Sequence, residues 1–93
     1  MIYAYAQLTI TNPDSLTAYR EKADAALARH GGQVLQGSGN LTALDGNPDM
    51  PNVAAILAFD TRDNALNWIK DPELADIHAL RRGAGKSDIV LLG

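Results

Sequence analysis

Periodic segments along this chain of 93 residues predict an α+β fold of the ferredoxin-like kind. The segments occur in the order strand, helix, strand, strand, helix, strand, which is the βαββαβ pattern of a split βαβ unit. Two observations support this order: polar and apolar side chains alternate strictly over residues 2–10, and start and stop signals bracket the helical segments. We therefore expect a four-stranded antiparallel sheet with helices on one face, in a single domain spanning residues 1–93.

The first strand and the first helix have clear signals. Alternate side chains over residues 2–10 point to opposite faces of a strand. Asn12 and Pro13 then begin a helix, because asparagine caps a helix well and proline fits its first turn. Apolar residues recur at helical spacing as far as His30, and the glycine pair 31–32 ends the helix.

The remaining elements are predicted from turn formers, caps and apolar runs. They are a weaker strand over residues 33–45, a loop over 45–51, a strand over 53–59, a helix from Thr61 through Lys70, a second helical segment from Asp71-Pro72 to about Ala84, and a last strand over 89–92. The loop is dense in Asp, Gly, Asn and Pro, which favour turns. Asp71-Pro72 is a helix restart because it joins a capping side chain to a first-turn proline.

The composition excludes several classes of protein. Because the chain has no cysteine, disulfides, thiolate nucleophiles and cysteine-ligated metals are excluded. Its formal net charge of −3 argues against nucleic acid as a partner. No apolar run approaches the roughly 20 residues that cross a membrane, and no basic signal region begins the chain, so we expect a cytoplasmic protein without a membrane partner. The acidic residues are scattered and no nucleotide motif fits, so neither a metal nor a cofactor is expected.

Two strands are apolar on both faces, which predicts a homodimer. The segments 53–59 and 89–92 are almost continuously apolar, although the helices can cover only one face of a four-stranded sheet. A second copy of the chain is the commonest cover for such a face. Tyr3, Tyr5 and Gln7 point to that face, and we place them in the dimer interface, where their polar atoms need partners.

The last helix carries the best candidates for chemistry. His78 and Arg81 are three residues apart and therefore share a helix face. Arg81 could stabilise a phenolate or an enolate, and His78 could act as acid or base; the alternative is that both are cations favoured by a helix end. Tyr19 and Trp68 could wall an apolar ligand pocket or simply fill the core, and His30 could face that pocket or only end its helix.

These residues resemble a known family. The matching positions are Tyr19, Gly31-Gly32, Gly39, Leu44-Asp45-Gly46, Phe59, Ala65, Trp68, Asp71-Pro72-Glu73, Arg81 and Gly93. Through them the chain is similar to the domain-of-unknown-function family 1330, a bacterial family of the dimeric α+β barrel superfamily. The resemblance implies a homodimer with facing sheets and a small organic molecule between sheet and helices. It implies site roles for Arg81 and Trp68 but no particular reaction.

The chain departs from the family pattern at four positions. Gly37 stands where the family commonly has arginine, and Ala58 where it has glutamate, which would be a charge pair lost from neighbouring strands. Ile69 and Leu74 replace usual tyrosines. A site that loses polar groups loses the specificity that they carry, so this chain would bind a more apolar molecule or catalyse no reaction.

Three functions remain open. The first is an enzyme, such as a cofactor-independent oxygenase or an isomerase, that transforms a phenolic or enolic molecule in a helix–sheet pocket. The second is a dimer without a reaction that binds a ligand or only assembles. The third is haem binding through His30 or His78.

Overall fold

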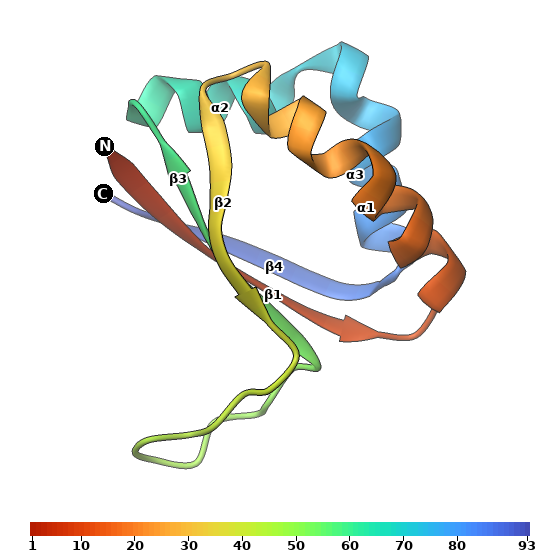
Figure 1. Cartoon of the computed structure of the whole chain (residues 1–93), viewed down its shortest axis with the longest axis vertical. Coiled ribbons are helices and arrows are strands. Elements are labelled where there is room, and N and C mark those ends of the chain that lie inside the picture. Colours follow the sequence, from red (N-terminus) through yellow and green to blue (C-terminus); the bar gives the residue numbers. More distant parts are fainter.

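The computed structural model describes all 93 residues and confirms the predicted ferredoxin-like fold (Figure 1). Its elements are β1 (Ile2–Ile10), α1 (Pro13–Ala28), β2 (Gly32–Ser38), β3 (Val53–Phe59), α2 (Arg62–Lys70), the 3-10 turn η1 (Pro72–Leu74), α3 (Ala75–Gly83) and β4 (Gly85–Leu92). The strands form one sheet in the order β2-β3-β1-β4, and every neighbouring pair is antiparallel.

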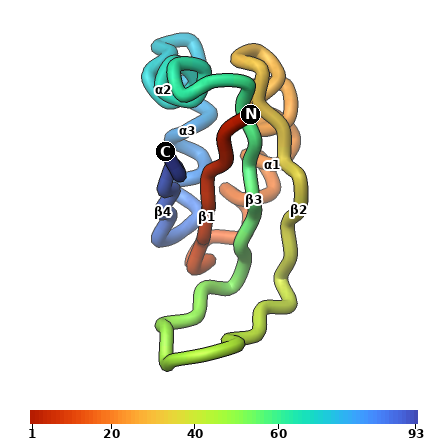
Figure 2. Tube along the Cα trace, turned by 90° about the vertical axis from the view of Figure 1, so that its left-hand side faces the viewer, coloured from red at the N-terminus to blue at the C-terminus, as the bar shows by residue number.

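All the helices lie on one face of the sheet. Figure 2 looks at the opposite face, where the four strands run in front of the helices and no element covers them. The pairing register places Tyr5 between Ile56 and Val90 on this uncovered face. Because side chains alternate along a strand, their sequence neighbours point toward the helices.

The core fills the space between the sheet and the helices. Phe59, Leu27 and His78 are its largest fully buried side chains. Much of the rest is small, and β1 contributes only Ala4 and Leu8 as fully buried residues. Small side chains at helix-facing positions leave room between the layers, which matters for the cavities described below.

Three boundaries differ from the sequence prediction. β2 ends at Ser38 instead of residue 45, and residues 39–52 extend beyond the sheet as a long connection between β2 and β3 (Figure 1). A bulge between Val34 and Gln36 interrupts the pairing of β2, and the pairing ends at Ser38, so that Gly39 and Asn40 lie outside the sheet. The helical segment after Asp71 begins with the short turn η1 before α3.

The third difference is that β4 begins at Gly85, four residues before the predicted start. Gly85 has a φ of 155°, and a Cβ atom there would lie 1.8 Å from the carbonyl oxygen of Thr9. Only glycine allows β4 to meet β1 directly after α3. The four missed residues include Ser87, whose side chain faces the helices.

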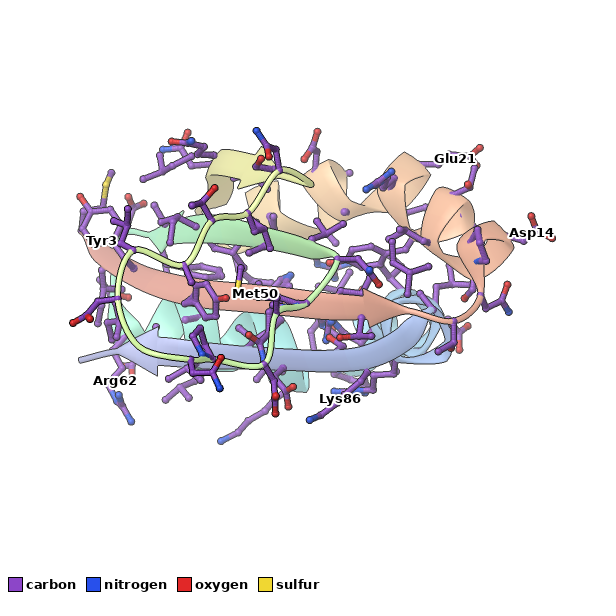
Figure 3. All side chains as sticks on the ribbon, turned by 90° about the horizontal axis from the view of Figure 1, so that it is seen from below. Tyr3, Asp14, Glu21, Met50, Arg62 and Lys86 are labelled. Carbon is purple, nitrogen blue, oxygen red and sulfur yellow. The ribbon has the colours of Figure 1, made fainter.

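Several charged side chains on the helices and on the sheet edge point into solvent. Asp14 and Glu21 project from α1, and Lys86 projects from β4, into solvent (Figure 3). None of the helices has the length and apolar character that crossing a membrane requires.

Candidate functional site

A buried arginine without an anionic partner is the central feature of the site. Arg81 comes from α3, and only 7% of its surface is exposed. The three ion pairs of the chain do not include it. Moving a charge out of water costs free energy unless the charge is paired. The neighbours of Arg81 must therefore offset this cost without an anion.

Two aromatic rings and a histidine surround the guanidinium. Its central carbon lies 5.5 Å from the ring centre of Tyr19 on α1 and 5.4 Å from that of Trp68 on α2. These distances allow cation–π attraction, which strengthens when the cation is desolvated. One amino group of Arg81, Nη1, donates to the Tyr19 hydroxyl at 3.4 Å and to Nδ1 of His78 at 2.8 Å.

His78 fixes the position of Arg81. Its Nε2 donates to the backbone carbonyl of Trp68 at 2.9 Å, so its Nδ1 is the free acceptor for Arg81. This carbonyl belongs to the last turn of α2, where carbonyls lack a partner within the helix. The Trp68 ring meets the imidazole edge-on at 4.7 Å. Burial lowers the pKa of His78 below its ordinary value, and the charges of Arg81 and Arg82 lower it further.

A cavity of about 490 Å³ opens between α1 and the sheet. Twelve of its twenty lining residues are hydrophobic, Tyr19 with its hydroxyl among them, and Arg81 is one of the polar ones. Alanines line it from three elements: Ala6 on β1, Ala23 on α1 and Ala55 on β3. We call this space the α1 cavity. Its size falls within the range of about 300–1,000 Å³ that is usual for small-molecule sites.

A smaller cavity of about 330 Å³ lies under α2, and we call it the α2 cavity. Trp68 and Ile69 line it from α2, and Phe59 from β3. Arg81 and Ser87 line both cavities, so they stand between the two spaces.

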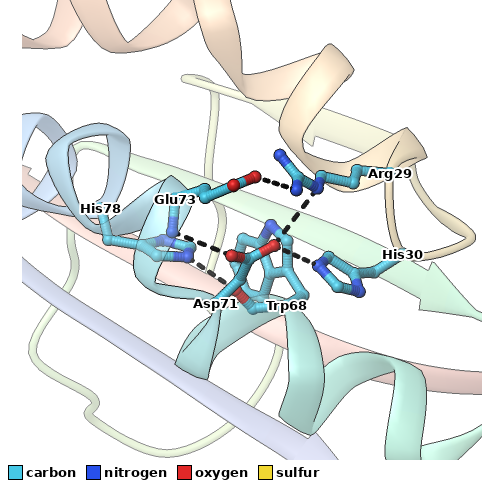
Figure 4. Close-up of polar contacts among 6 residues, drawn as sticks. All are labelled: Arg29, His30, Trp68, Asp71, Glu73 and His78. Atoms are coloured by element: carbon cyan, nitrogen blue, oxygen red, sulfur yellow. Dashed lines mark hydrogen bonds and ion pairs between the residues drawn. The ribbon is translucent and has the colours of Figure 1, made fainter.

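His30 lies away from both cavities, in a polar cluster at the ends of α1 and α2 (Figure 4). Its Nε2 lies 2.8 Å from Oδ2 of Asp71, and the same oxygen forms an ion pair with Nε of Arg29 at 3.3 Å. Arg29 pairs with Glu73 as well. The hydrogen bond from His30 lowers the pKa of Asp71, and the backbone N–H of Glu73 lowers it further.

The structure therefore brings four of the predicted site residues together and separates the fifth. One connected group contains His78, Arg81, Trp68 and Tyr19, whereas His30 belongs to the polar cluster at the ends of α1 and α2. Within the group only Arg81 and Tyr19 line the α1 cavity. His78 lines neither cavity, but it contacts two residues that do, Arg81 and Trp68.

The predicted interface residues lie on the uncovered face of the sheet. Tyr5 donates its hydroxyl hydrogen to Oε1 of Gln7 at 3.1 Å, and Nε2 of Gln7 reaches Oδ2 of Asp88 at 3.5 Å. Tyr3 is exposed on the same face. Neighbouring polar side chains on this face thus supply part of the hydrogen bonding that the tyrosine hydroxyls need.

The interpretation of Gly37 and Ala58 as a lost charge pair is wrong. Gly37 pairs with Ala55 in the register and lines the α1 cavity, whereas Ala58 pairs with Tyr3 and Gln33 on the uncovered face. Side chains at the two positions point to opposite sides of the sheet, so an arginine and a glutamate there would not meet across it.

Sequence patterns alone miss the roles of two residues: Ser87, which lines both cavities, and Asp71, which belongs to the polar cluster with His30. Ser87 was placed outside the last strand, although the alternation of Ser87, Ile89 and Leu91 extends that strand backward on its helix-facing side. Asp71 was recognised as a cap only; its Oδ1 does accept from the backbone N–H of Glu73 at 2.9 Å. Its hydrogen bond with His30 joins residues 41 positions apart in the sequence and has no local signal.

No group of three or more His, Asp or Glu side chains could hold a metal ion.

Comparison with known families identifies the chain. The model of a family described as a domain of unknown function, DUF1330, matches residues 1–93. The chain belongs to the DUF1330 family. A search of curated protein sequences finds no significant match.

Solved structures share the fold at low sequence identity. A protein of unknown function from Rhodopseudomonas palustris, RPA0582, has a TM-score of 0.72 and 19% identity over 98% of this chain and 79% of its own. SnoaB, a cofactor-independent oxygenase from Streptomyces nogalater, has a TM-score of 0.66 and 16% identity over 99% and 90%. A dimeric ferredoxin-like protein of unknown function from Thermobifida fusca has a TM-score of 0.59 and 15% identity over 99% and 89%.

The lowered pKa of His78 predicts a loss of stability in mild acid. In the unfolded chain this histidine binds a proton at its ordinary pKa of about 6.5, whereas the folded protein resists protonation until a lower pH. Between the folded-state pKa and the ordinary value the unfolded state therefore binds more protons, and the free energy of unfolding falls as the pH falls through this range. We expect the melting temperature to decline between about pH 7 and pH 5.

The variant His78→Gln should flatten this decline, and the matched variant His30→Gln should retain it. Asp71 contributes stability above its ordinary pKa of 3.8, which is lost only at lower pH, so it does not affect this range. Thermal unfolding followed by circular dichroism measures the effect. An equal pH dependence in wild type and His78→Gln would contradict the assignment of a buried, neutral His78.

Proposed function

We propose that this DUF1330 protein is a homodimer that binds a small phenolic or enolic anion in the α1 cavity, with Arg81 as the binding group. The observation that carries the proposal is the buried guanidinium of Arg81, which has no carboxylate partner and lines a mainly apolar cavity. An anion in this position would provide the missing countercharge. The apolar walls would accept the ring or chain that carries it.

Tyr19 supports an oxygen ligand at the same place. Its hydroxyl oxygen accepts from Arg81, so its own hydrogen is available to donate. A phenolate or enolate oxygen near Arg81 would therefore meet a guanidinium and a hydroxyl donor. At the cavity mouth Arg20 and Asp24 are both exposed and of opposite charge, so the rim favours neither sign.

Catalysis is the first form of this function. An enolate or phenolate is the electron-rich species that a cofactor-independent oxygenase or an isomerase needs, and a positioned cation lowers the energy of such an anion. One structurally similar protein, SnoaB, is a cofactor-independent oxygenase. The proposal gives Arg81 the role of stabilising the charge and gives His78 the role of positioning Arg81.

Binding without a reaction is the second form, and one observation favours it. Both ring nitrogens of His78 already have partners, so His78 is not a free base in the cavity. No histidine lines the α1 cavity. A protein that only holds an organic anion needs Arg81 and Tyr19 but no base.

The uncovered sheet face supports the homodimer. Four of its large apolar side chains are exposed: Tyr3, Ile56, Val90 and Leu92. Contiguous exposed apolar surface of this kind marks interaction sites, and a symmetric pair of identical faces is the commonest way to cover it. The Thermobifida fusca protein of the same fold is described as dimeric.

Removal of the Arg81 charge should abolish most of the affinity for a phenolate. In Arg81→Met the long apolar stem is kept and the guanidinium is lost, so 4-nitrophenolate should bind about 10- to 100-fold more weakly, as expected for losing a hydrogen bond worth about 1.5–3 kcal/mol between charged groups. Arg82→Met is the matched control, because Arg82 is the exposed neighbour of Arg81. Titration followed by 4-nitrophenolate absorbance measures both variants.

Equal affinity of wild type and Arg81→Met would remove Arg81 from the site. Oxygen consumption and product formation with a panel of phenols then separate the two forms of the function. Turnover that depends on Arg81 supports an enzyme, and saturable binding without turnover supports a ligand-binding protein.

A charge placed on the uncovered face should separate the dimer. In Val90→Glu the new carboxylate would be buried against the partner, so light scattering should give the mass of one chain with unchanged secondary structure. The control Ala25→Glu places the same charge on the outer side of α1 and should keep the mass of two chains. A wild-type protein that is monomeric at micromolar concentration would contradict the proposed homodimer.

A further inference from the structure

The α2 cavity concentrates the unsatisfied hydrogen-bond donors of the protein. Only two buried side-chain nitrogen or oxygen atoms have no partner, Nε1 of Trp68 and Nε of Arg81. Trp68 and Arg81 both line the α2 cavity, and Trp68 does not line the α1 cavity. Trp68 is 97% buried and Arg81 is 93% buried, because their exposed fractions are 3% and 7%.

An orphaned donor is a cost that needs a reason. Leaving a buried N–H group unpaired costs about 1–3 kcal/mol, so buried polar groups nearly always have partners. Both orphaned atoms are donors, which means that an acceptor would satisfy them and another donor would not. Two unpaired donors beside one cavity therefore indicate that this cavity lacks a hydrogen-bond acceptor.

The remaining lining of the α2 cavity is apolar or positively charged. Eight of its eleven lining residues are hydrophobic, including Phe59 and Leu66. The others are Arg81, Arg82 and Ser87, so no carboxylate lines the cavity. An anion with an apolar body therefore fits its walls better than a cation or a sugar does.

We infer that the α2 cavity is a second binding compartment, and that it takes a small aromatic or aliphatic carboxylate. The carboxylate oxygens accept from the indole N–H of Trp68 and the guanidinium of Arg81, and the hydrocarbon part lies against Phe59 and Leu66. A carboxylate suits the site because it offers two acceptor oxygens and no donor. This compartment is separate from the α1 cavity, although Arg81 lines both.

Arg81 lines both cavities, so the two compartments share its charge. Its Nη1 donates to Tyr19 and His78, and its Nε, which has no partner, is the donor that a carboxylate in the α2 cavity would satisfy. Two anions bound at once would share one guanidinium and repel each other. Occupation of the α2 cavity by a carboxylate therefore weakens phenolate binding in the α1 cavity, and the reverse holds equally.

Titration with benzoate tests the inference. Because Trp68 is the only tryptophan, its fluorescence reports directly on the α2 cavity, and calorimetry gives the affinity. Benzoate should bind saturably and at least about tenfold more tightly than benzyl alcohol, which has the ring but no charge. Trp68→Phe keeps an aromatic ring but removes the donor, and calorimetry should show benzoate binding about tenfold more weakly.

Two cavity-filling variants separate this inference from the proposed function. Ala65→Leu fills the α2 cavity and should abolish benzoate binding while 4-nitrophenolate still binds. Ala23→Leu makes the same change in the α1 cavity and should do the opposite. Leu66→Phe replaces Ala65→Leu if circular dichroism shows that the latter does not fold, because Leu66 is only half buried.

The outcomes are distinct. Benzoate binding that is lost in Ala23→Leu and kept in Ala65→Leu overturns the second compartment and leaves the proposed function intact. No saturable benzoate binding to the wild-type protein also overturns it. Benzoate binding in Ala23→Leu without any 4-nitrophenolate binding to wild type supports the second compartment and overturns the α1 site.

Discussion

The site depends on one interaction, the hydrogen bond between His78 and Arg81. A guanidinium buried without an anion would ordinarily turn toward solvent, because arginine has a long and flexible stem. Here Nδ1 of His78 accepts from it, and Nε2 of His78 is held by the carbonyl of Trp68. The imidazole must be neutral to accept this bond, and the burial that lowers its pKa keeps it neutral. The charge of Arg81 is thus retained inside the protein by a neutral partner, which leaves it available to an anionic ligand.

The fold makes this interaction possible by breaking the second helix. Asp71 leaves the helical conformation with a ψ of 117°, as a residue before proline prefers, and the chain restarts through η1 into α3. The break turns the end of α2 toward α3, so the free carbonyl of Trp68 meets His78. The side chain of Asp71 ties the same junction to His30 at the end of α1. The Asp71-Pro72 break, which is a local signal in the sequence, therefore sets how α1, α2 and α3 meet beside the site.

Much of the fold could be predicted from the sequence, because its signals are local. The alternation over residues 2–10 gave the first strand, and the caps at Asn12, Thr61 and Asp71 gave the helix starts. The predicted end of β2 and the predicted start of β4 were wrong. The pairing of β2 with β3 stops at Ser38, and Gly85 lies against the backbone of Thr9; both depend on contacts between strands, which have no local signal.

The site could be predicted in part for the same reason. Helical spacing placed His78 and Arg81 together, but the roles of the two residues depend on what each contacts. His78 is hydrogen-bonded to the carbonyl of Trp68, ten residues earlier in the sequence. His30 is bonded to Asp71, 41 residues later. The cavities are the consequence of small side chains from separate elements, such as Ala6, Ala23 and Ala55, which no local pattern reveals. The same small side chains explain why a chain so rich in apolar residues contains only five aromatic ones.

The central claim is that Arg81 is kept inside the protein without a countercharge so that a ligand can supply one. Nuclear magnetic resonance of the side-chain N–H groups tests it most directly, because the indole of Trp68 gives a single signal and Nε–H of Arg81 can be assigned by its loss in Arg81→Met. Addition of benzoate should move both signals along one saturation curve, and 4-nitrophenolate should move the signals of Arg81. Signals that stay unchanged at saturating concentrations of both anions would contradict the claim.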